Sequence, residues 1–340
     1  AIKAKGAGLY IEGNATLIKT EISGCKFGTE SSGTFSETNG GGIYVDKKGI
    51  CNINEGVVIK ENKCTVANMC GGGIYISGDS GDSGTVNIKG ESAENPVLIQ
   101  SNDADNGGGI FTQGTLAIKF TKLSGHTNSD NGGGIYVSAG SVTAEDCTFA
   151  DNEALSVGGA VYVNDGTFKI KGSTTFTVDN GKNDVYLKTG KTISLDGNLN
   201  KNSVARITPA AYTVGKQVLT GDDLTANCTK FAVTPNGTQE WEIDTDGKLA
   251  KKRKTIKNSD TNAWKQLKNA VSAAADGDVI IIDGEIMASK QNNNFGEIKI
   301  TKKLTIRGKN GVSSDILNAN TSQTKKEHRI FSVEGVGQLT

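Results

Sequence analysis

The chain has 340 residues, including 45 glycines and 3 prolines, with 22% charged residues and a formal net charge of zero. This balance excludes a basic nucleic-acid-binding protein and a polyacidic disordered chain. No run of 18 apolar residues occurs, so we expect no transmembrane helix. The chain has no initiator Met and no signal-peptide pattern at Ala1, and we interpret it as a mature product or a fragment.

One short motif recurs along residues 1–190: a turn of small or polar residues followed by an apolar–aromatic–apolar strand. Asn39-Gly-Gly-Gly-Ile-Tyr-Val45 and Asn131-Gly-Gly-Gly-Ile-Tyr-Val137 are the clearest of the seven copies. The steps between the aromatic residues are 34, 31, 36, 25, 26 and 24 residues, a range that indicates a repeat architecture. A solenoid acts mainly through a long surface of equivalent positions. Those positions are Tyr10, Tyr44, Tyr75, Phe111, Tyr136, Tyr162 and Tyr186.

Each period contains short alternating strands, and these predict an all-β fold, a parallel β-helix over residues 1–190. Alternation places Ile43 and Val45 on one face of a strand and Tyr44 on the other. The glycines are expected to form corners with positive φ and to let neighbouring coils approach closely. If Ile and Val point inward, the aromatic residues form an outward column. We interpret this column as a stabilising stacking ladder, with a sugar- or protein-binding stripe as the alternative.

An apolar-x-x-Asn element precedes the glycine corner in several copies, as in Ile59-Lys-Glu-Asn62 and Ile99-Gln-Ser-Asn102. Phe149-Ala-Asp-Asn152 followed by Gly158-Gly-Ala-Val161 resembles the F-x-x-N and G-G-A-I repeat of the chlamydial polymorphic outer membrane proteins. Other copies depart from that repeat, since Gly replaces Ala at the third corner position. The resemblance implies a right-handed, pectate-lyase-like β-helix on a bacterial cell surface. It also implies adhesion to host or neighbouring cells.

The six cysteines leave the redox compartment open. Cys64 and Cys70 are close enough in sequence for a loop disulfide. Cys25 and Cys147 occupy similar local sequences, which favours buried small side chains at both places. No zinc site is predicted, because no CxxC occurs and His126 and His328 lie far from the cysteines in sequence.

The corner carboxylates are expected mainly to be solvated turn residues. Asp103, Asp105 and Asp130 are the best Ca²⁺ candidates, although they lack the ligand register of an EF-hand loop. No recurring carboxylate pair and no Ser/His/Asp set is present in residues 1–190, so we expect no catalytic residues, no enzyme and no other cofactor. A carbohydrate-binding or polysaccharide-cleaving β-helix is the alternative.

The repeat ends at Leu187, and residues 191–250 predict a small antiparallel module that caps the β-helix. Asn236-Gly237 and Asp246-Gly247 lie between alternating strands, which is a hairpin signal. An open solenoid end exposes unpaired backbone groups, so a cap is expected there.

Residues 251–340 predict a short amphipathic cap helix followed by the first coils of another β-helix. The apolar face of the helix contains Trp264, Leu267, Ala270, Val271 and Ala274. Helix and strands together resemble the N-terminal cap of pectate-lyase-like β-helices. Counted from Phe331, the Tyr10 of a following copy would lie 19 residues on, near the length of one coil.

We therefore expect the chain to be about one period of a tandem or end-to-end array. A fragment of a protein with two β-helices is the alternative. The expected function is that of a non-catalytic extracellular structural or adhesive protein, a unit of a surface fibre. Its expected partners are further copies of itself, host or neighbouring cell surfaces, and glycans.

Overall fold

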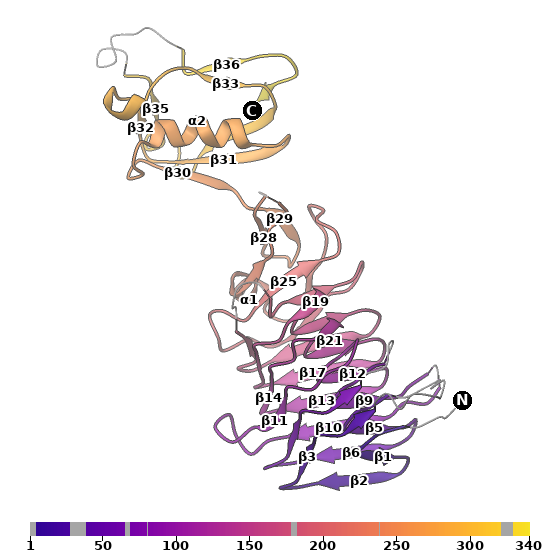
Figure 1. The fold of residues 1–340 in the computed structure, drawn as a ribbon. Coiled ribbons are helices and arrows are strands. Elements are labelled where there is room, and N and C mark those ends of the chain that lie inside the picture. The colour runs from indigo at the N-terminus through magenta and orange to yellow at the C-terminus, as the bar shows by residue number, and fades with distance from the viewer. Residues whose placement is uncertain are drawn as a thin grey trace. The chain divides into compact units, whose positions relative to one another are not determined.

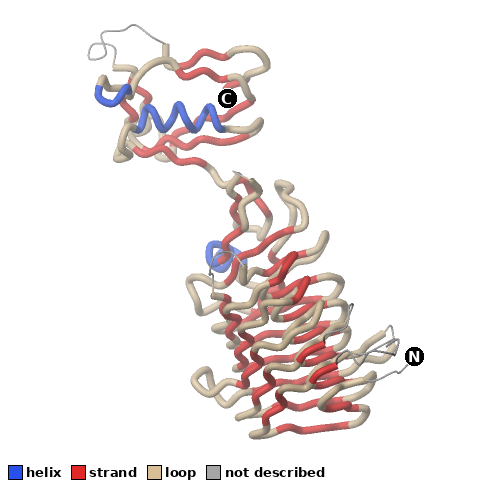
Figure 2. Tube along the Cα trace, in the orientation of Figure 1, coloured by secondary structure: helices blue, strands red, loops and turns tan. Residues whose placement is uncertain are grey.

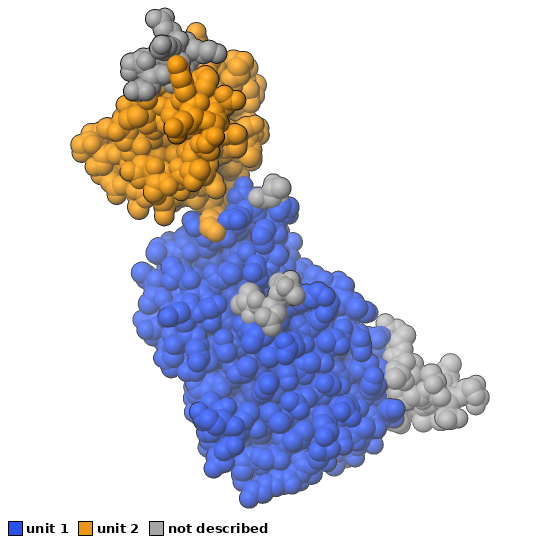
Figure 3. Space-filling view, turned by 60° about the vertical axis from the view of Figure 1, so that its left-hand side comes forward, with its two compact units in different colours: residues 1–250 blue, residues 251–340 orange. Residues whose placement is uncertain are grey.

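The structure, a computed structural model, describes residues 5–27, 39–64, 69–79, 81–177, 182–237, 239–320 and 329–340. The chain divides into two compact units, residues 1–250 and residues 251–340 (Figure 3). Of the two boundaries expected from the sequence, the one after residue 250 coincides with this division. The other, after residue 190, lies inside the first unit. No helix among the described residues is long and apolar enough to cross a membrane.

The first unit is a parallel β-helix, as predicted (Figure 1). The first six coils each add one strand to three sheets, the later coils extend only the first two, and loops form the corners between the sheets (Figure 2). The first sheet has nine strands in the order β1 (Leu9–Ile11), β5 (Ile43–Val45), β9 (Ile74–Ile76), β12 (Ile110–Thr112), β16 (Ile135–Val137), β20 (Val161–Val163), β23 (Val185–Leu187), β25 (Ala205–Pro209) and β27 (Phe231–Val233).

Two further parallel sheets complete each coil. The second sheet has eight strands: β2 (Asn14–Leu17), β6 (Ile50–Ile53), β10 (Thr85–Lys89), β13 (Thr115–Lys119), β17 (Ser141–Glu145), β21 (Thr167–Lys171), β24 (Ile193–Asp196) and β26 (Leu219–Gly221). The third sheet has six: β3 (Glu21–Ser23), β7 (Val58–Lys60), β11 (Val97–Gln100), β14 (Thr121–Ser124), β18 (Thr148–Ala150) and β22 (Thr175–Phe176). Short strand pairs at the corners are β4 (Lys26–Phe27) with β8 (Lys63–Cys64) and β15 (Ser129–Asn131) with β19 (Ala154–Val157).

The interior of the coils is filled by the inward residues of the three sheets. Ile43, Ile74 and Ile110 pair across β5, β9 and β12, and each is fully buried. A slip of one residue would turn these side chains to the outside, so burial fixes the register of every strand. The alternation read from the sequence therefore gives the correct inward face.

Glycine serves two different purposes at each corner. The first glycine of a run has positive φ, +77° at Gly40 and +70° at Gly71, which favours glycine over other residues. The third glycine does not have a positive φ, but it lies against the backbone of the next coil. A Cβ on Gly73 would sit 2.6 Å from the carbonyl oxygen of Gly109, so the close approach of two backbones excludes a side chain.

Of the antiparallel module predicted for residues 191–250, only the C-terminal part is antiparallel. Strands β24, β25, β26 and β27 all pair in parallel with the preceding coils. Among the described residues of this segment, antiparallel pairing occurs in the hairpin of β28 (Trp241–Ile243) and β29 (Leu249–Lys251), which turns at Asp246-Gly247 as predicted, and in the bridges Asn236–Gln239 and Gln217–Lys248. The last glycine corner is Gly158-Gly159, and the Tyr186 copy already lacks it, but parallel stacking needs only inward apolar residues, and these continue. A short helical corner, α1 (Leu224–Asn227) and η1 (Cys228–Lys230), precedes β27.

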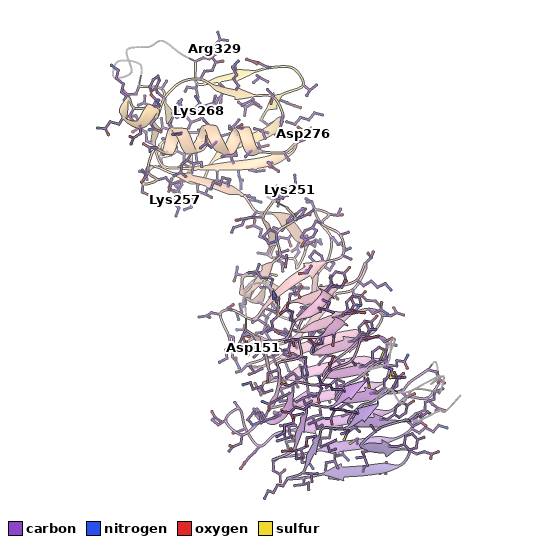
Figure 4. The ribbon with its side chains drawn as sticks, viewed as in Figure 1. Asp151, Lys251, Lys257, Lys268, Asp276 and Arg329 are labelled. Carbon is purple, nitrogen blue, oxygen red and sulfur yellow. The ribbon has the colours of Figure 1, made fainter. Side chains whose placement is uncertain are left out.

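The second unit also consists of parallel coils, with one helix packed on them. Trp264 and Leu267 of α2 (Ala263–Ala273) are fully buried, and the Trp264 indole donates a hydrogen bond to the Gly296 carbonyl at 2.8 Å. Lys268 lies on the same helix (Figure 4). One sheet contains β30 (Lys254–Lys257), β31 (Asp278–Asp283), β34 (Lys303–Gly308) and β37 (Gln338–Leu339). Two further strand pairs are β32 (Ile286–Met287) with β35 (Leu317–Asn318) and β33 (Ile298–Ile300) with β36 (Phe331–Val333). The short helix η2 (Gln291–Asn293) forms a corner.

The sequence analysis counted Phe331 as the counterpart of an outward aromatic residue, and this assignment is wrong by one residue. Phe331 pairs with the buried Ile298 and packs against the core of the second unit, so it faces inward. Ser332 pairs with the exposed Lys299 and lies on the outward face of the strand. Two adjacent apolar residues, Ile330 and Phe331, left the sequence alternation ambiguous here.

Candidate functional site

The seven predicted aromatic residues form one continuous stack on the first sheet, which we call the aromatic column. Neighbouring ring centroids lie 4.8–5.1 Å apart from Tyr44 to Tyr186, with interplanar angles of 5–17°. Tyr10 ends the stack with a longer, tilted contact to Tyr44 at 5.7 Å and 32°. The spacing follows the coil repeat of about 4.8 Å, so each strand delivers one ring to the stack.

The interior rings of the column use both faces against their neighbours. Tyr44, Tyr75 and Phe111 are 5%, 8% and 7% exposed, whereas Tyr10 is 42% exposed. Burial raises the pKa of Tyr136 to about 12. A sugar that stacks on an aromatic residue needs an open ring face, and in the column only the terminal rings lack a neighbour on one face. The geometry therefore favours the stacking ladder over a binding stripe along its length.

Tyr10 is the most exposed ring of the column and is held by polar contacts. Its hydroxyl donates to the Asp46 carboxylate at 2.5 Å, and Lys5 Nζ lies 3.1 Å from the same carboxylate. The hydrogen bond to Asp46 raises the pKa of Tyr10 to about 12. Further along, the Tyr75 hydroxyl donates to Gln113 at 3.1 Å. These contacts orient the hydroxyl groups of the column toward the next corner.

A second stack lies inside the β-helix, at the corner between the third and first sheets. We call it the inner ladder, and Asp151, labelled in Figure 4, is the residue before one of its members. All of its members are at most 4% exposed. Three of them are the asparagines of the apolar-x-x-Asn element. The members are Asn62, Asn102, His126, Asn152 and Asn183.

The asparagines of the inner ladder repeat one hydrogen-bonding scheme. The Asn102 side-chain oxygen accepts the Asn62 backbone N–H at 3.0 Å, and its amide group donates to the Ile59 carbonyl at 3.0 Å. Asn62 does the same with the Cys25 N–H and the Ile22 carbonyl, both at 3.0 Å. Each amide thus satisfies two buried backbone groups of the coil before it, groups that would be costly to leave unpaired.

His126 takes an asparagine position in this ladder, which the sequence motif did not reveal. The Asn102 backbone N–H donates to Nδ1 at 3.1 Å, and Nε2 lies 3.2 Å from the Ile99 carbonyl. The ring is fully buried, and burial lowers its pKa to about 4. Its neutral form, with the proton on Nε2, reproduces the donor and acceptor of an asparagine amide.

Cys25 takes the position of the first coil that aligns with the inner ladder, although it is only half-buried, and it is not equivalent to Cys147, contrary to the sequence comparison. The backbone pairing of Ile22 with Ile59 and of Lys26 with Lys63 aligns Cys25 with Asn62. Cys147 instead precedes β18 and is fully buried. The two similar local sequences therefore lie at different positions of the coil.

Cys64 and Cys70, for which the sequence allowed a loop disulfide, are both free cysteines in the structure. Burial raises the pKa of each thiol to about 12, which disfavours the reactive thiolate. Cys64 packs in a small apolar cluster with Met69 and Ala104.

The three Ca²⁺ candidates do not form a common site. The Asp103 carboxylate lies 3.5 Å from Lys63 Nζ and accepts a hydrogen bond from Asn128 at 3.4 Å. The Asp105 carbonyl accepts the Asp130 backbone N–H at 2.7 Å, a contact of the main chain. Among the described residues, no group of three or more His, Cys, Asp or Glu side chains is arranged to hold a metal ion. His328 lies outside the described residues.

Comparison of the chain with protein-family models, with curated proteins and with solved structures finds no match.

Proposed function

We propose that this chain is a non-catalytic structural segment of an extended β-helical fibre on a bacterial cell surface, where it contributes to adhesion. The observation that carries the proposal is the aromatic column together with the inner ladder, two stacks that continue from coil to coil. A long solenoid held together by such repeated contacts suits a stiff surface stalk or fibre. The resemblance of its repeat to that of the polymorphic outer membrane proteins supports a place on the cell surface.

Charged side chains on the outside support the same role, because they also join neighbouring coils. Glu145 on β17 lies 2.5 Å from Lys119 on β13 and 3.0 Å from Lys171 on β21. Lys60 on β7 pairs with Glu21 on β3 at 3.2 Å. Individually such surface pairs contribute at most about 1 kcal/mol. As a repeated pattern they hold the coils in register.

The first coil supports the proposal that the fibre continues beyond this segment. Leu17 and Ile22 face the interior but remain half-buried, whereas their partners Ile53 and Ile59 in the next coil are fully buried. A further coil stacked on β1, β2 and β3 would bury them. In the proposed array that coil belongs to the same polypeptide or to a neighbouring copy.

Electron microscopy of the purified chain tests the assembly part of the proposal. We expect end-to-end chains, and Leu17→Asp should abolish them because it places a charge on the stacking surface. Thr16→Asp is the matched control, since Thr16 is exposed on the outward side of the same strand. Separate particles that never form chains would contradict self-assembly.

Incubation with pectin, polygalacturonate and glycosaminoglycans tests the non-catalytic part. We expect no new reducing ends or unsaturated products from any of them. Cleavage of one of these polymers would replace the structural role with that of a polysaccharide-cleaving β-helix. Binding without cleavage would instead identify the glycan as an adhesion partner.

A further inference from the structure

His126 is the one member of the inner ladder whose side chain can gain a charge near physiological pH. We propose that it makes its corner of the β-helix an acid-sensitive point, at which the coils open locally when the pH falls. This property goes beyond the proposed structural role. It rests on the position of the ring between the coil of Asn102 and the coil of Asn152.

The neutral ring fits the ladder because it supplies one acceptor and one donor. Nδ1 accepts the Asn102 backbone N–H at 3.1 Å, and the proton on Nε2 is directed at the Ile99 carbonyl, 3.2 Å away. On the other side, the His126 backbone N–H donates to the Asn152 side-chain oxygen at 3.4 Å. The ring therefore continues the scheme of the asparagines without a break.

Protonation removes the acceptor on which this arrangement depends. With both nitrogens protonated, the Asn102 N–H faces another donor instead of a lone pair. The Asn102 carbonyl lies 3.2 Å from Nδ1 and could accept the added proton, but the Asn102 N–H would remain buried without a partner. An unsatisfied buried donor and a buried charge both disfavour the closed corner.

No anion among the described residues compensates the charge. Two carboxylates of the surrounding corners are paired at the surface, Asp103 with Lys63 and Glu153 with Lys182. Asp130 and Asp151 are exposed, and Asp105 is half-buried. The ring itself is fully buried, and only this burial and the backbone of Asn102 and Ile99 act on its pKa.

The direction of the pH effect follows from the two pKa values. The pKa of His126 is about 4 in the folded chain, against an ordinary value of 6.5. Because the folded value is the lower one, the stabilisation is complete above pH 6.5 and is lost as the pH falls from there toward 4. The equilibrium for opening the corner should rise about tenfold per pH unit, and by about 30-fold between neutral pH and pH 5.

Hydrogen–deuterium exchange at pH 7.5 and pH 5.0, corrected for intrinsic exchange rates, measures this opening. We expect the segments 99–109 and 123–134 to lose protection about 30-fold at the lower pH. The segment 185–196 of the same unit is the internal reference and should not change. His126→Asn should remove the acid response, because asparagine fills the equivalent ladder positions.

Three outcomes would overturn the inference. The wild-type corner could keep its protection at pH 5.0, the response could persist in His126→Asn, or the reference segment could open to the same extent. If His126→Asn does not fold, Asn152→His provides the test in the opposite direction. Folded Asn152→His should acquire a new acid response in the segment 149–160, and its absence would contradict the inference.

Discussion

The inner ladder and the aromatic column pass through the same coils but stabilise them by different means. The inner ladder buries amides that satisfy backbone groups, so each member depends on the atoms before and after it. The aromatic column stacks rings whose only strict need is a flat neighbour about 5 Å away. Exposure differs in the same sense, since every member of the inner ladder is at most 4% exposed, whereas the column is buried at Tyr44, Tyr75 and Phe111, half-buried from Tyr136 to Tyr186 and 42% exposed at its terminal Tyr10.

This contrast explains which positions tolerate variation. The column accepts Phe111 among tyrosines, because a ring of the same shape preserves both stacking contacts. The inner ladder accepts His126 only because one tautomer matches an amide in donor and acceptor. We therefore expect polar substitutions to be most damaging in the inner ladder and ring exchanges to be nearly neutral in the column.

The largest effect is expected from Asn102→Ala. The change leaves the Asn62 backbone N–H and the Ile59 carbonyl buried without their partner, and should lower the free energy of unfolding by about 4 kcal/mol. Asn128→Ala is the control on the exposed side of a nearby corner and should change it by less than about 0.5 kcal/mol. Urea unfolding of both variants measures the difference. Equal effects would mean that the inner ladder is not a special stabilising element.

The next largest effect is expected where the glycine corner lies against the ladder. Gly73→Ala would place a Cβ 2.6 Å from the Gly109 carbonyl oxygen and 3.0 Å from the Asn102 amide, and should destabilise the fold by about 3 kcal/mol. Gly81→Ala meets nothing within 4 Å and should be tolerated. Thermal unfolding followed by circular dichroism distinguishes them. A stable Gly73→Ala variant would show that the coils can separate at this corner without cost.

A smaller effect is expected in the aromatic column, and it should depend on position. Phe111→Ala removes a ring stacked on both faces and should cost about 2 kcal/mol. Tyr10→Ala removes a half-exposed ring with one neighbour in the column and should cost less than about 1 kcal/mol.

Binding of host cells or glycans by the same variants separates the two interpretations of the column. Reduced melting temperature with intact binding supports the ladder. Lost binding at unchanged stability of Phe111→Ala would identify a binding stripe instead.

The sequence predicted the features that repeat by residue type and missed those that repeat only by position. The aromatic column and the three asparagines of the apolar-x-x-Asn element could be found because the same residue types recur at these positions. Leu123-Ser-Gly-His126 and Ile22-Ser-Gly-Cys25 have the spacing of the apolar-x-x-Asn element. They were not recognised as copies of it, because histidine and cysteine replace the asparagine. Asn183 was hidden because it follows Phe176 by seven residues in sequence instead of three.

The end of the repeat was misjudged for a related reason. Loss of the repeated motif after Leu187 suggested that the β-helix stops, yet Val185 pairs with Ile207 and Ala205 with Phe231 in continued parallel register. Corner chemistry and strand stacking are separate requirements. A sequence can therefore lose the glycine corner and still keep the parallel stacking of its strands.

The smallest expected effect concerns the charges outside both stacks. Hydrogen bonding to Lys119 and then to Lys171 holds the pKa of Glu145 below its ordinary value, against the opposing effect of burial. Because the folded pKa is the lower one, the stabilisation is present at neutral pH and is lost as acid protonates the carboxylate.

Glu145→Gln should therefore cost no more than about 1 kcal/mol at neutral pH, and roughly 0.5 M salt should reduce this difference. Asp130→Asn is the control, because Asp130 is exposed and makes no ion pair with a described residue. Denaturant unfolding at neutral and acidic pH measures both variants. A loss as large as that of Asn102→Ala would mean that the outer charges, rather than the buried amides, hold the coils together.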